Sequence, residues 1–201
     1  MATKILGNLP CGLVFVISAP AGTGKTTLVR MLIGEFDCIA ESISCTTRAI
    51  RPGEIPGKDY FFLTDAEFQK KKQAGDFLEC AEVFGHYYGT SKEYVLEQQH
   101  LGKHVFLVID TQGALLLKEQ GFSAVYVFLS PPSIEELKGR LHKRQTETHE
   151  VIEKRLSWAN EELQMIHHYD YHIVNDHLER AYVILRSIVI AEEHRIRNLK
   201  S

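Results

Sequence analysis

The stretch that decides the fold is Leu13-Val-Phe-Val-Ile-Ser18, followed directly by Ala19-Pro-Ala-Gly-Thr-Gly-Lys-Thr26. The first half is an unbroken apolar run, which is typical of a strand covered on both faces in a parallel sheet. The second half is a glycine-rich turn, and the segment Thr26–Glu35 behind it is predicted to be a helix. Gly22 and Gly24 allow the backbone to curl, so that successive N–H groups can point inward at phosphate oxygens. The sequence therefore predicts a strand, a phosphate-binding loop and a helix in direct succession.

This loop matches the P-loop pattern, except that Ala19 replaces the leading glycine. The positive end of the following helix adds to the attraction for phosphate. We expect the Lys25 ammonium to contact the β- and γ-phosphates of a nucleoside triphosphate, and the Thr26 hydroxyl to bind Mg²⁺. The residues expected to bind this phosphoryl donor are Ala19, Pro20, Ala21, Gly22, Thr23, Gly24, Lys25, Thr26 and Thr27.

The composition of the 201-residue chain is that of one globular domain, with 44% hydrophobic and 24% charged residues. These values exclude a disordered chain, a collagen-like repeat and a disulfide-stapled miniprotein. The formal net charge of −3 gives no general basic field, so no nucleic-acid partner is expected. The chain has no apolar run of membrane-spanning length, and its four cysteines form no CxxC pair. Met1–Pro10 lacks the apolar region of a secretory signal, so no such signal is expected. We therefore expect a cytoplasmic protein with reduced thiols that does not enter a membrane.

Apolar runs and helical segments alternate along most of the chain, which predicts an α/β fold with a parallel sheet flanked by helices. The further strands are expected at His104–Asp110, Ala124–Ser130 and Tyr171–Val174. The further helices are expected at Lys92–Leu101, Gln112–Gln120, Ser133–Arg144, Glu150–His168 and Leu178–Arg197.

The region from about Glu41 to Thr90 interrupts this alternation. Short strand-like pieces are expected at Glu41–Cys45, Tyr60–Leu63 and Phe77–Phe84, with a short helix at Asp65–Gln73. The helix is introduced by a capping box, Thr64-Asp-Ala-Glu67. This region predicts a small mixed α+β insertion on the sheet. A second insertion, the polar stretch Lys143–Glu150, lacks an apolar anchor and is expected to be mobile.

The first insertion carries groups suited to a phosphorylated acceptor. Arg48 and Arg51 lie three residues apart in a polar segment, and two guanidinium groups suit a monophosphate dianion. Tyr60 and Tyr88 could donate phenolic hydrogen bonds or stack on a base. On their own, such arginines and tyrosines would be read as surface charges and packing residues. Their order behind a P-loop favours an acceptor site.

Glu79 indicates which base the acceptor carries. A carboxylate only accepts hydrogen bonds, and the Watson–Crick edge of guanine offers N1–H and N2–H₂ donors, whereas adenine offers no such pair. A buried Glu79 would therefore select guanine, and Ser44 or Thr90 could bind O6 or N7. Asp110 ends an apolar strand, where a carboxylate can hold a Mg²⁺-bound water or orient the acceptor.

The chain from about Gly12 to Arg195 resembles a guanylate kinase. The resembling blocks are the P-loop, SCTTRAIRPGE at Ser44–Glu54, GKDYFF at Gly57–Phe62, FLECAEVFGHYYGT at Phe77–Thr90, IDTQG at Ile109–Gly113, LSPPS at Leu129–Ser133, EKRL at Glu153–Leu156 and IVND at Ile173–Asp176. The resemblance implies a core (1–38, 92–138 and 156–201), a GMP-binding subdomain (39–91) and a mobile lid (139–155). It also implies phosphoryl transfer from ATP to GMP or dGMP with Mg²⁺, which gives ADP and GDP.

The resemblance assigns roles residue by residue. The matching GMP-site residues are Ser44, Arg48, Arg51, Tyr60, Glu79, Tyr88, Thr90 and Asp110, and Asn175 matches the loop on the adenine side of ATP. Lys25, Arg48 and the lid arginines Arg140, Arg144 and Arg155 are expected to neutralise the transferring group. Mg²⁺ is expected on Thr26, with Asp110 acting through water.

The sequence departs from the family pattern at two positions. Val108 stands where guanylate kinases usually carry a second aspartate, two residues before Asp110, and Gln145 stands where they often carry glycine. Because residues two apart in a strand share a face, one carboxylate is missing from the side that bears Asp110. Two alternatives stay open: a non-catalytic guanylate-kinase-like binding module, and a kinase of another small phosphorylated acceptor. The sequence also leaves open whether the protein is a monomer or a homo-oligomer.

Overall fold

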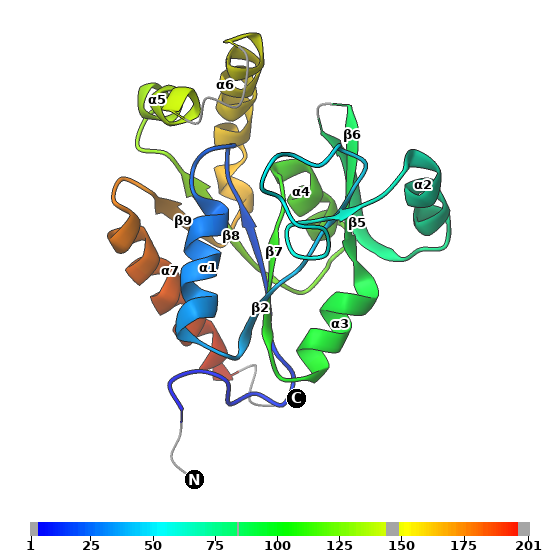
Figure 1. The fold of residues 1–201 in the computed structure, drawn as a ribbon. Helices are drawn as coiled ribbons and strands as arrows, with labels where there is room; N and C mark the ends of the chain where they lie inside the picture. Colours follow the sequence, from blue (N-terminus) through cyan, green and yellow to red (C-terminus); the bar gives the residue numbers. More distant parts are fainter. Residues whose placement is uncertain (1–3, 84, 144–148, 197–201) are drawn as a thin grey trace.

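The central layer is a sheet of five parallel strands in the order β2-β7-β1-β8-β9 (Figure 1). The strands are β1 (Val14–Ser18), β2 (Ile39–Glu41), β7 (His104–Val108), β8 (Val125–Ser130) and β9 (Tyr171–Val174). These bounds come from a computed structural model, which describes residues 4–83, 85–143 and 149–196. The α/β fold with a parallel sheet that the sequence predicts is therefore confirmed.

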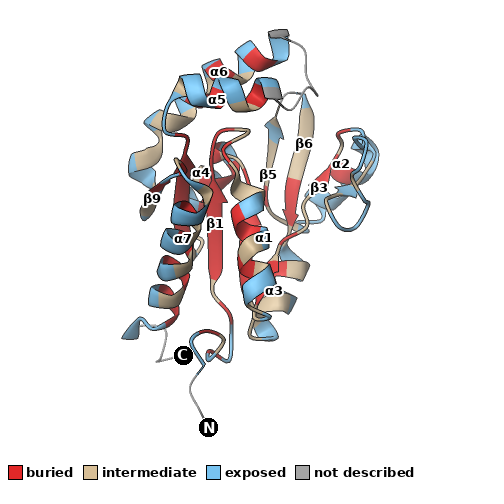
Figure 2. Ribbon diagram, turned by 60° about the vertical axis from the view of Figure 1, so that its left-hand side comes forward, coloured by how far each residue is buried: buried red, intermediate tan, exposed pale blue. Residues whose placement is uncertain are grey.

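Helices cover both faces of this sheet, as the continuous apolar strands require. One face packs on α1 (Lys25–Glu35) and α7 (Leu178–Glu193), and the other packs on α3 (Lys92–His100) and α4 (Thr111–Glu119). Figure 2 shows β1 coloured as buried, in agreement with the burial of all its residues. None of the described helices combines the length and the apolar character needed to cross a membrane.

The predicted mixed insertion is present as a second sheet of four strands in the order β4-β3-β6-β5. Its elements are β3 (Cys45–Thr46), β4 (Phe61–Phe62), β5 (Phe77–Val83), β6 (His86–Ser91) and helix α2 (Asp65–Gln73). The predicted capping box forms in full, since Thr64 and Glu67 each accept a backbone N–H of the other. The buried Phe68 of α2 stacks on Phe77 and Tyr87, which fastens the helix to the sheet.

The structure changes one boundary of the insertion. The sequence predicts a single strand over Glu41–Cys45 within the insertion, which is wrong. Ile39–Glu41 instead pairs in parallel with β7 in the central sheet, and Cys45–Thr46 pairs with β4 and β6 in the second sheet. The chain therefore leaves the central sheet only after Glu41.

Three other predicted ends also differ. The strand predicted to reach Asp110 ends at Val108, because the Asp110 side chain caps α4 by accepting the Gly113 N–H at 2.8 Å. The helix predicted over Glu150–His168 is α6 (His149–Gln164), followed by the short 3₁₀ helix η1 (Ile166–His168). Helix α7 ends at Glu193, before the predicted Arg197.

Helices α5 (Ile134–Lys143) and α6 lie side by side above the carboxyl ends of the central strands (Figure 1). They enclose an apolar cluster of their own, made of Leu137, Leu141, Ile152, Leu156 and Ala159. The two helices therefore form a small packed unit. The stretch predicted to be mobile falls largely on residues 144–148, which lie outside the described residues.

Candidate active site

The P-loop has the backbone form that its glycines predict. Gly22 and Gly24 adopt φ values of 91° and 104°, which are unfavourable for other residues. Helix α1 begins directly after Gly24 and has no side-chain cap, so its first N–H groups face the loop. The Lys25 ammonium donates to the Ala19 carbonyl at 2.5 Å. The loop thus presents amide donors and one cation, the combination that holds a polyphosphate.

The remaining loop residues form its support. Ala19, Pro20 and Thr23 are buried, and the Thr23 hydroxyl donates to the Pro20 carbonyl at 2.8 Å. Thr27 is exposed on the first turn of α1. Three of the residues assigned to ATP line the main cavity described below: Ala21, Lys25 and Thr26.

Asn175 lies against the P-loop. The side chain is buried, and its amide donates to the Thr23 carbonyl at 2.7 Å. A Cβ on Gly24 would lie 2.8 Å from the same amide nitrogen, so this contact requires glycine there. The Asn175 carbonyl in turn accepts from the Arg140 guanidinium at 3.0 Å. Asn175 therefore links the P-loop to α5 through two hydrogen bonds.

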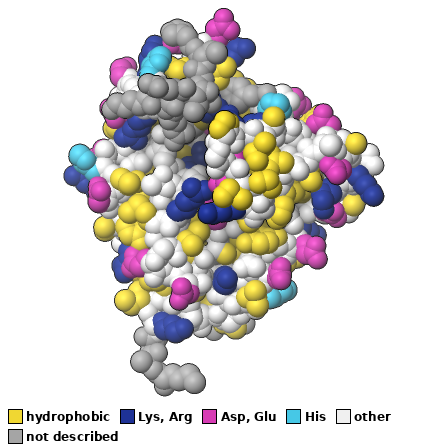
Figure 3. Space-filling view, in the orientation of Figure 1, with side chains coloured by type: hydrophobic (Ala, Val, Ile, Leu, Met, Phe, Trp, Pro, Cys, Tyr) yellow, Lys and Arg dark blue, Asp and Glu magenta, His cyan; other side chains and the backbone are white. Residues whose placement is uncertain are grey.

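A cavity of about 240 Å³ joins the P-loop to the second sheet. Figure 3 shows Lys and Arg side chains gathered near the middle of this face of the molecule. The predicted site residues that line the cavity are Ala21, Lys25, Thr26, Ser44, Arg48, Arg51, Tyr60, Glu79, Tyr88, Asp110 and Arg155. We call this space the acceptor cavity. Most of the residues predicted for the acceptor are thus brought together.

The two arginines of the insertion are held by a carboxylate that the sequence analysis did not assign. Arg48 is buried and forms an ion pair with Glu54 at 2.7 Å, while Glu54 also accepts the Arg51 N–H at 2.9 Å. The Arg48 guanidinium lies 5.3 Å from the centre of the Tyr60 ring. The only sequence signal for Glu54 is its place in the same polar segment, three residues after Arg51.

Glu79 lies at the buried end of the acceptor cavity, with 6% of its surface exposed. It accepts from the Thr90 hydroxyl at 2.6 Å, and its other oxygen is so close to Gly113 that a Cβ there would lie 2.6 Å away. Burial raises the pKa of Glu79 to about 7. The hydrogen bond from Thr90 lowers this pKa, and the nearby charge of Asp110 raises it. The sequence predicts that the Thr90 hydroxyl binds the base. In the structure this hydroxyl donates its hydrogen bond to Glu79.

Asp110 lies between the two halves of the site. Its carboxylate caps α4, and burial raises its pKa while the Gly113 N–H and the Lys25 ammonium lower it. Val108 lines the same acceptor cavity, so the residue that replaces the usual aspartate faces the site as the two-residue period predicts. Asp110 is thus close enough to Lys25 for the positive charge of the lysine to lower its pKa.

Two residues of α6 line the site but could not be predicted from the sequence. Glu162 and Trp158 line a smaller cavity of about 100 Å³, together with Lys25, Asp110 and Arg155. Glu162 accepts from the Thr111 hydroxyl at 3.3 Å, and burial raises its pKa while Lys25 lowers it. A glutamate in the last turn of a long helix gives no signal in the sequence, because only the fold brings it to the P-loop.

The lid arginines are placed differently from one another. Arg155 of α6 lines both the acceptor cavity and the smaller cavity. Arg140 of α5 contacts Glu136 at 3.3 Å and the Asn175 carbonyl. Arg144 lies outside the described residues.

The site fits a divalent cation only when a nucleotide supplies further oxygens. Across residues 4–83, 85–143 and 149–196, no three His, Cys, Asp or Glu side chains cluster in a way that could hold a metal. Thr26 and Asp110 both line the acceptor cavity and offer oxygen atoms, which Mg²⁺ prefers. The amides of the P-loop would hold the phosphates that complete such a site.

Comparison with known proteins gives a consistent match over the whole domain. The family model described as guanylate kinase matches residues 12–192. The guanylate kinase of Protochlamydia amoebophila is 57% identical over 185 residues, which cover 92% of this chain and 93% of that protein. The guanylate kinase of Chlamydia trachomatis serovar D is 48% identical over 184 residues, covering 91% and 89%. The crystal structure of guanylate kinase from Anaplasma phagocytophilum superimposes with a TM-score of 0.77 at 35% identity, covering 92% and 88%. The chain therefore belongs to the guanylate kinase family.

Proposed function

We propose that the protein transfers the γ-phosphoryl group of ATP to GMP, giving ADP and GDP. One observation carries the proposal: a single cavity joins Lys25 and Thr26 of the P-loop to Arg48, Arg51 and Glu79 of the second sheet. A triphosphate held by the loop and a monophosphate held by the arginines would meet within this cavity. The membership of the guanylate kinase family supports the same reaction.

The residues contribute by positioning and by neutralising charge. An oxygen of the GMP phosphate is already a competent nucleophile, so the transfer requires no general base. Lys25 and Arg155 would face the transferring phosphoryl group, and Arg48 and Arg51 would hold the acceptor phosphate. Thr26 and, through water, Asp110 would hold the Mg²⁺ that enters with ATP, which supplies further positive charge at the phosphates.

Glu79 would confer the preference for guanine. Its carboxylate accepts from N1–H and N2–H₂, and Ser44 at the rim of the cavity can reach a further polar atom of the base. Sites built on buried hydrogen bonds can discriminate by about 10⁴-fold or more against a substrate that leaves them unpaired. GMP and dGMP carry the same guanine edge, so both are proposed as acceptors.

We also propose a division of labour within the chain. The second sheet with α2, from Ser42 to Ser91, would be the GMP-binding subdomain, and residues 139–155 would be a lid over the donor. The separate apolar cluster of α5 and α6 supports movement of these helices as one unit. Arg140, Arg144 and Arg155 would then close over the phosphates and exclude water. The four cysteines are free thiols, which supports a reducing, cytoplasmic location.

The proposal is tested by an assay of acceptors. Purified protein with ATP and Mg²⁺ should convert GMP and dGMP, and should leave AMP, UMP and sugar phosphates unchanged. Lys25→Ala should lose most of kcat, whereas Lys92→Ala, at an exposed position on α3, should not. Equal turnover across the acceptors would favour a kinase of another small phosphorylated molecule. Failure to bind ATP would favour the non-catalytic binding module, and near-normal kcat in Lys25→Ala would refute the role of this lysine.

A further inference from the structure

A third cavity, of about 190 Å³, lies beside the acceptor cavity, between α1 and the end of β2. The two cavities share Thr26, Ser44, Tyr60 and Val108 as lining residues. The third cavity is distinguished by Glu41, the last residue of β2, and by Ser42 directly after it. The remaining lining residues are Arg30, Glu54, Lys58 and Asp59. Neither Glu41 nor Ser42 has a part in the proposed function.

The register of the central sheet places Glu41 on the same face as Val108. Glu41 is the partner of Phe106 in the parallel pair of β2 and β7. Partners in a parallel pair share a face, and residues two apart in a strand do so as well. Phe106 packs in the apolar cluster with Leu28, which identifies this face as the one covered by α1. The carboxylate therefore stands on the side of the sheet where the usual aspartate is replaced by valine.

Two polar side chains of this cavity, Glu41 and Ser42, have no hydrogen-bond or ion-pair partner among the described residues. Among the described residues, no hydrogen bond or ion pair reaches the Glu41 carboxylate, and Arg30 is paired with Asp59 at 2.8 Å. Burial raises the pKa of Glu41. The negative charge of Asp59 raises it further, and the positive charge of Arg30 lowers it. The Ser42 hydroxyl is fully buried and likewise has no partner in the described part of the chain. Buried polar atoms are almost always satisfied, so the cavity is built to be filled by a polar ligand or by water.

We infer that Glu41 is a positioning residue for the metal–nucleotide complex, whose carboxylate accepts hydrogen bonds from the water shell of the divalent cation at Thr26. Mg²⁺ dehydrates reluctantly and keeps several waters, which need fixed acceptors in the protein. Val108 has no polar atom to offer, and Glu41 reaches the same cavity from the neighbouring strand. The Ser42 hydroxyl is the second acceptor or donor for this water. The inference rests on the proposed function only in that ADP and ATP bind at the P-loop.

The test separates metal binding from nucleotide binding. Free Mn²⁺ is measured by its electron paramagnetic resonance signal while it is titrated into the protein–ADP complex, and ADP alone is titrated by calorimetry. Glu41→Gln and Glu41→Val should weaken Mn²⁺ binding by about tenfold, as loss of an outer-shell carboxylate commonly does. Metal-free ADP should bind both variants within about twofold of its wild-type affinity, since no amide of the P-loop is altered.

The double variant Glu41→Val/Val108→Asp moves the carboxylate from β2 to β7 and should recover most of the Mn²⁺ affinity. Glu93→Gln, at an exposed position on α3, is the matched control and should behave as wild type. Unchanged Mn²⁺ affinity in both single variants would overturn the inference, as would failure of the double variant to recover it while metal-free ADP still binds. Absence of ADP binding in the wild-type protein would instead refute the proposed function, and this inference with it.

Discussion

Glu79 lies in surroundings that oppose the charge its role requires. It is almost completely buried, and its pKa is raised to about 7 mainly by that burial. Guanine, however, offers hydrogen-bond donors that only the ionised carboxylate can accept in full. Hydrogen bonding from Thr90 stabilises the charge in part, and the base must supply the rest. Near neutral pH the residue is therefore poised between two protonation states before GMP arrives.

This balance predicts that GMP binds more weakly in acid. Below pH 7 the free protein carries a proton on Glu79 that must leave when GMP binds, so affinity should fall by up to about tenfold per pH unit. Above pH 7 the carboxylate is already ionised and this dependence should vanish. Calorimetric Kd values for GMP between pH 5.5 and 8.5 measure the effect. The phosphate of GMP titrates in the same range, so the comparison must be made against a variant.

Glu79→Gln provides that comparison. It should bind GMP at least tenfold more weakly at pH 8 and should lack the additional dependence near pH 7, because the amide does not titrate. The phosphate of GMP contributes equally to both proteins and cancels in their ratio. A ratio of Kd values that stays constant over the whole pH range would show that Glu79 does not change its protonation when GMP binds.

At the scale of elements, the sequence predicted those helices and turns whose formation depends on interactions between residues close together in the chain. The strand, P-loop and α1 follow from an apolar run and from glycines that adopt positive φ. Helix α2 begins where the capping box predicts, because Thr64 and Glu67 satisfy each other's amides without help from the rest of the chain. The split of Glu41–Cys45 between two sheets could not be read in the same way, because the partners of both pieces come from distant segments.

The same distinction applies to the site. Arg48, Arg51 and Glu79 were predictable because their chemistry and their order behind the P-loop match an acceptor nucleotide. Glu162 was not, because a helix in the second half of the chain brings it to Lys25 only in the folded molecule. Glu41 was hidden for a related reason: its relation to Val108 exists only through the pairing of β2 with β7.

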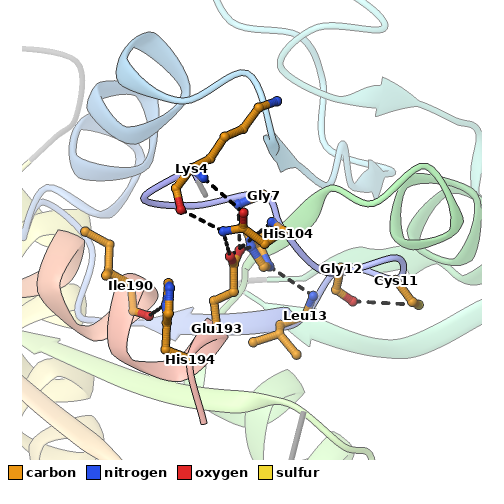
Figure 4. A network of polar contacts seen from close by, with 10 residues as sticks. Lys4, Gly7, Cys11, Gly12, Leu13, His104, Ile190, Glu193 and His194 are labelled. Carbon is orange, nitrogen blue, oxygen red and sulfur yellow. Dashed lines mark hydrogen bonds and ion pairs between the residues drawn. The ribbon is translucent and has the colours of Figure 1, made fainter. Parts of the chain in front are cut away.

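A contact between α7, β7 and the N-terminal segment stabilises the end of the central sheet that lies opposite the site. The buried carboxylate of Glu193, at the end of α7, accepts the N–H groups of Gly7 and Asn8 at 2.7 and 3.0 Å and contacts His104 Nε2 at 2.6 Å (Figure 4). The Leu13 N–H donates to His104 Nδ1 at 3.1 Å, so the ring proton lies on Nε2 and is donated to Glu193. Burial lowers the pKa of His104 despite the carboxylate, which keeps the ring neutral.

Replacement of Glu193 should therefore destabilise the fold without altering the chemistry. Glu193→Ala leaves the buried His104 ring and the less buried N–H groups of Gly7 and Asn8 without their acceptor, and we expect a loss of about 1–3 kcal/mol in the free energy of unfolding. Urea denaturation measures this loss. Glu119→Gln, at an exposed position at the end of α4, should stay within about 0.5 kcal/mol of wild type. At temperatures where the variant is folded its kcat should be unchanged, and a large fall in kcat would contradict the separation of this end from the site.

At the scale of the whole molecule, the site is assembled from three units that touch at the carboxyl ends of the central strands. The P-loop belongs to the central sheet, Glu79 and the arginines belong to the second sheet, and Arg155 belongs to the α5–α6 pair. The α5–α6 pair has an apolar cluster of its own, so its movement relative to the central sheet would cost little core packing. Two anionic ligands that bridge the units would draw them together by neutralising the cations that line the cavities.

Trp158 offers a direct measure of that closure, because it is the single tryptophan of the chain and lines the cavity that contains Lys25 and Arg155. Closure would exclude water from this cavity. We therefore expect that saturating MgADP and GMP together reduce the quenching of Trp158 fluorescence by acrylamide by about twofold or more, and that either ligand alone has a smaller effect. Arg155→Ala should bind the nucleotides more weakly and, even at saturation, should lose most of this protection, since the link from the lid to the phosphates is gone. Calorimetric binding of both ligands to the wild-type protein without any change in quenching would mean that the α5–α6 unit does not close over the site.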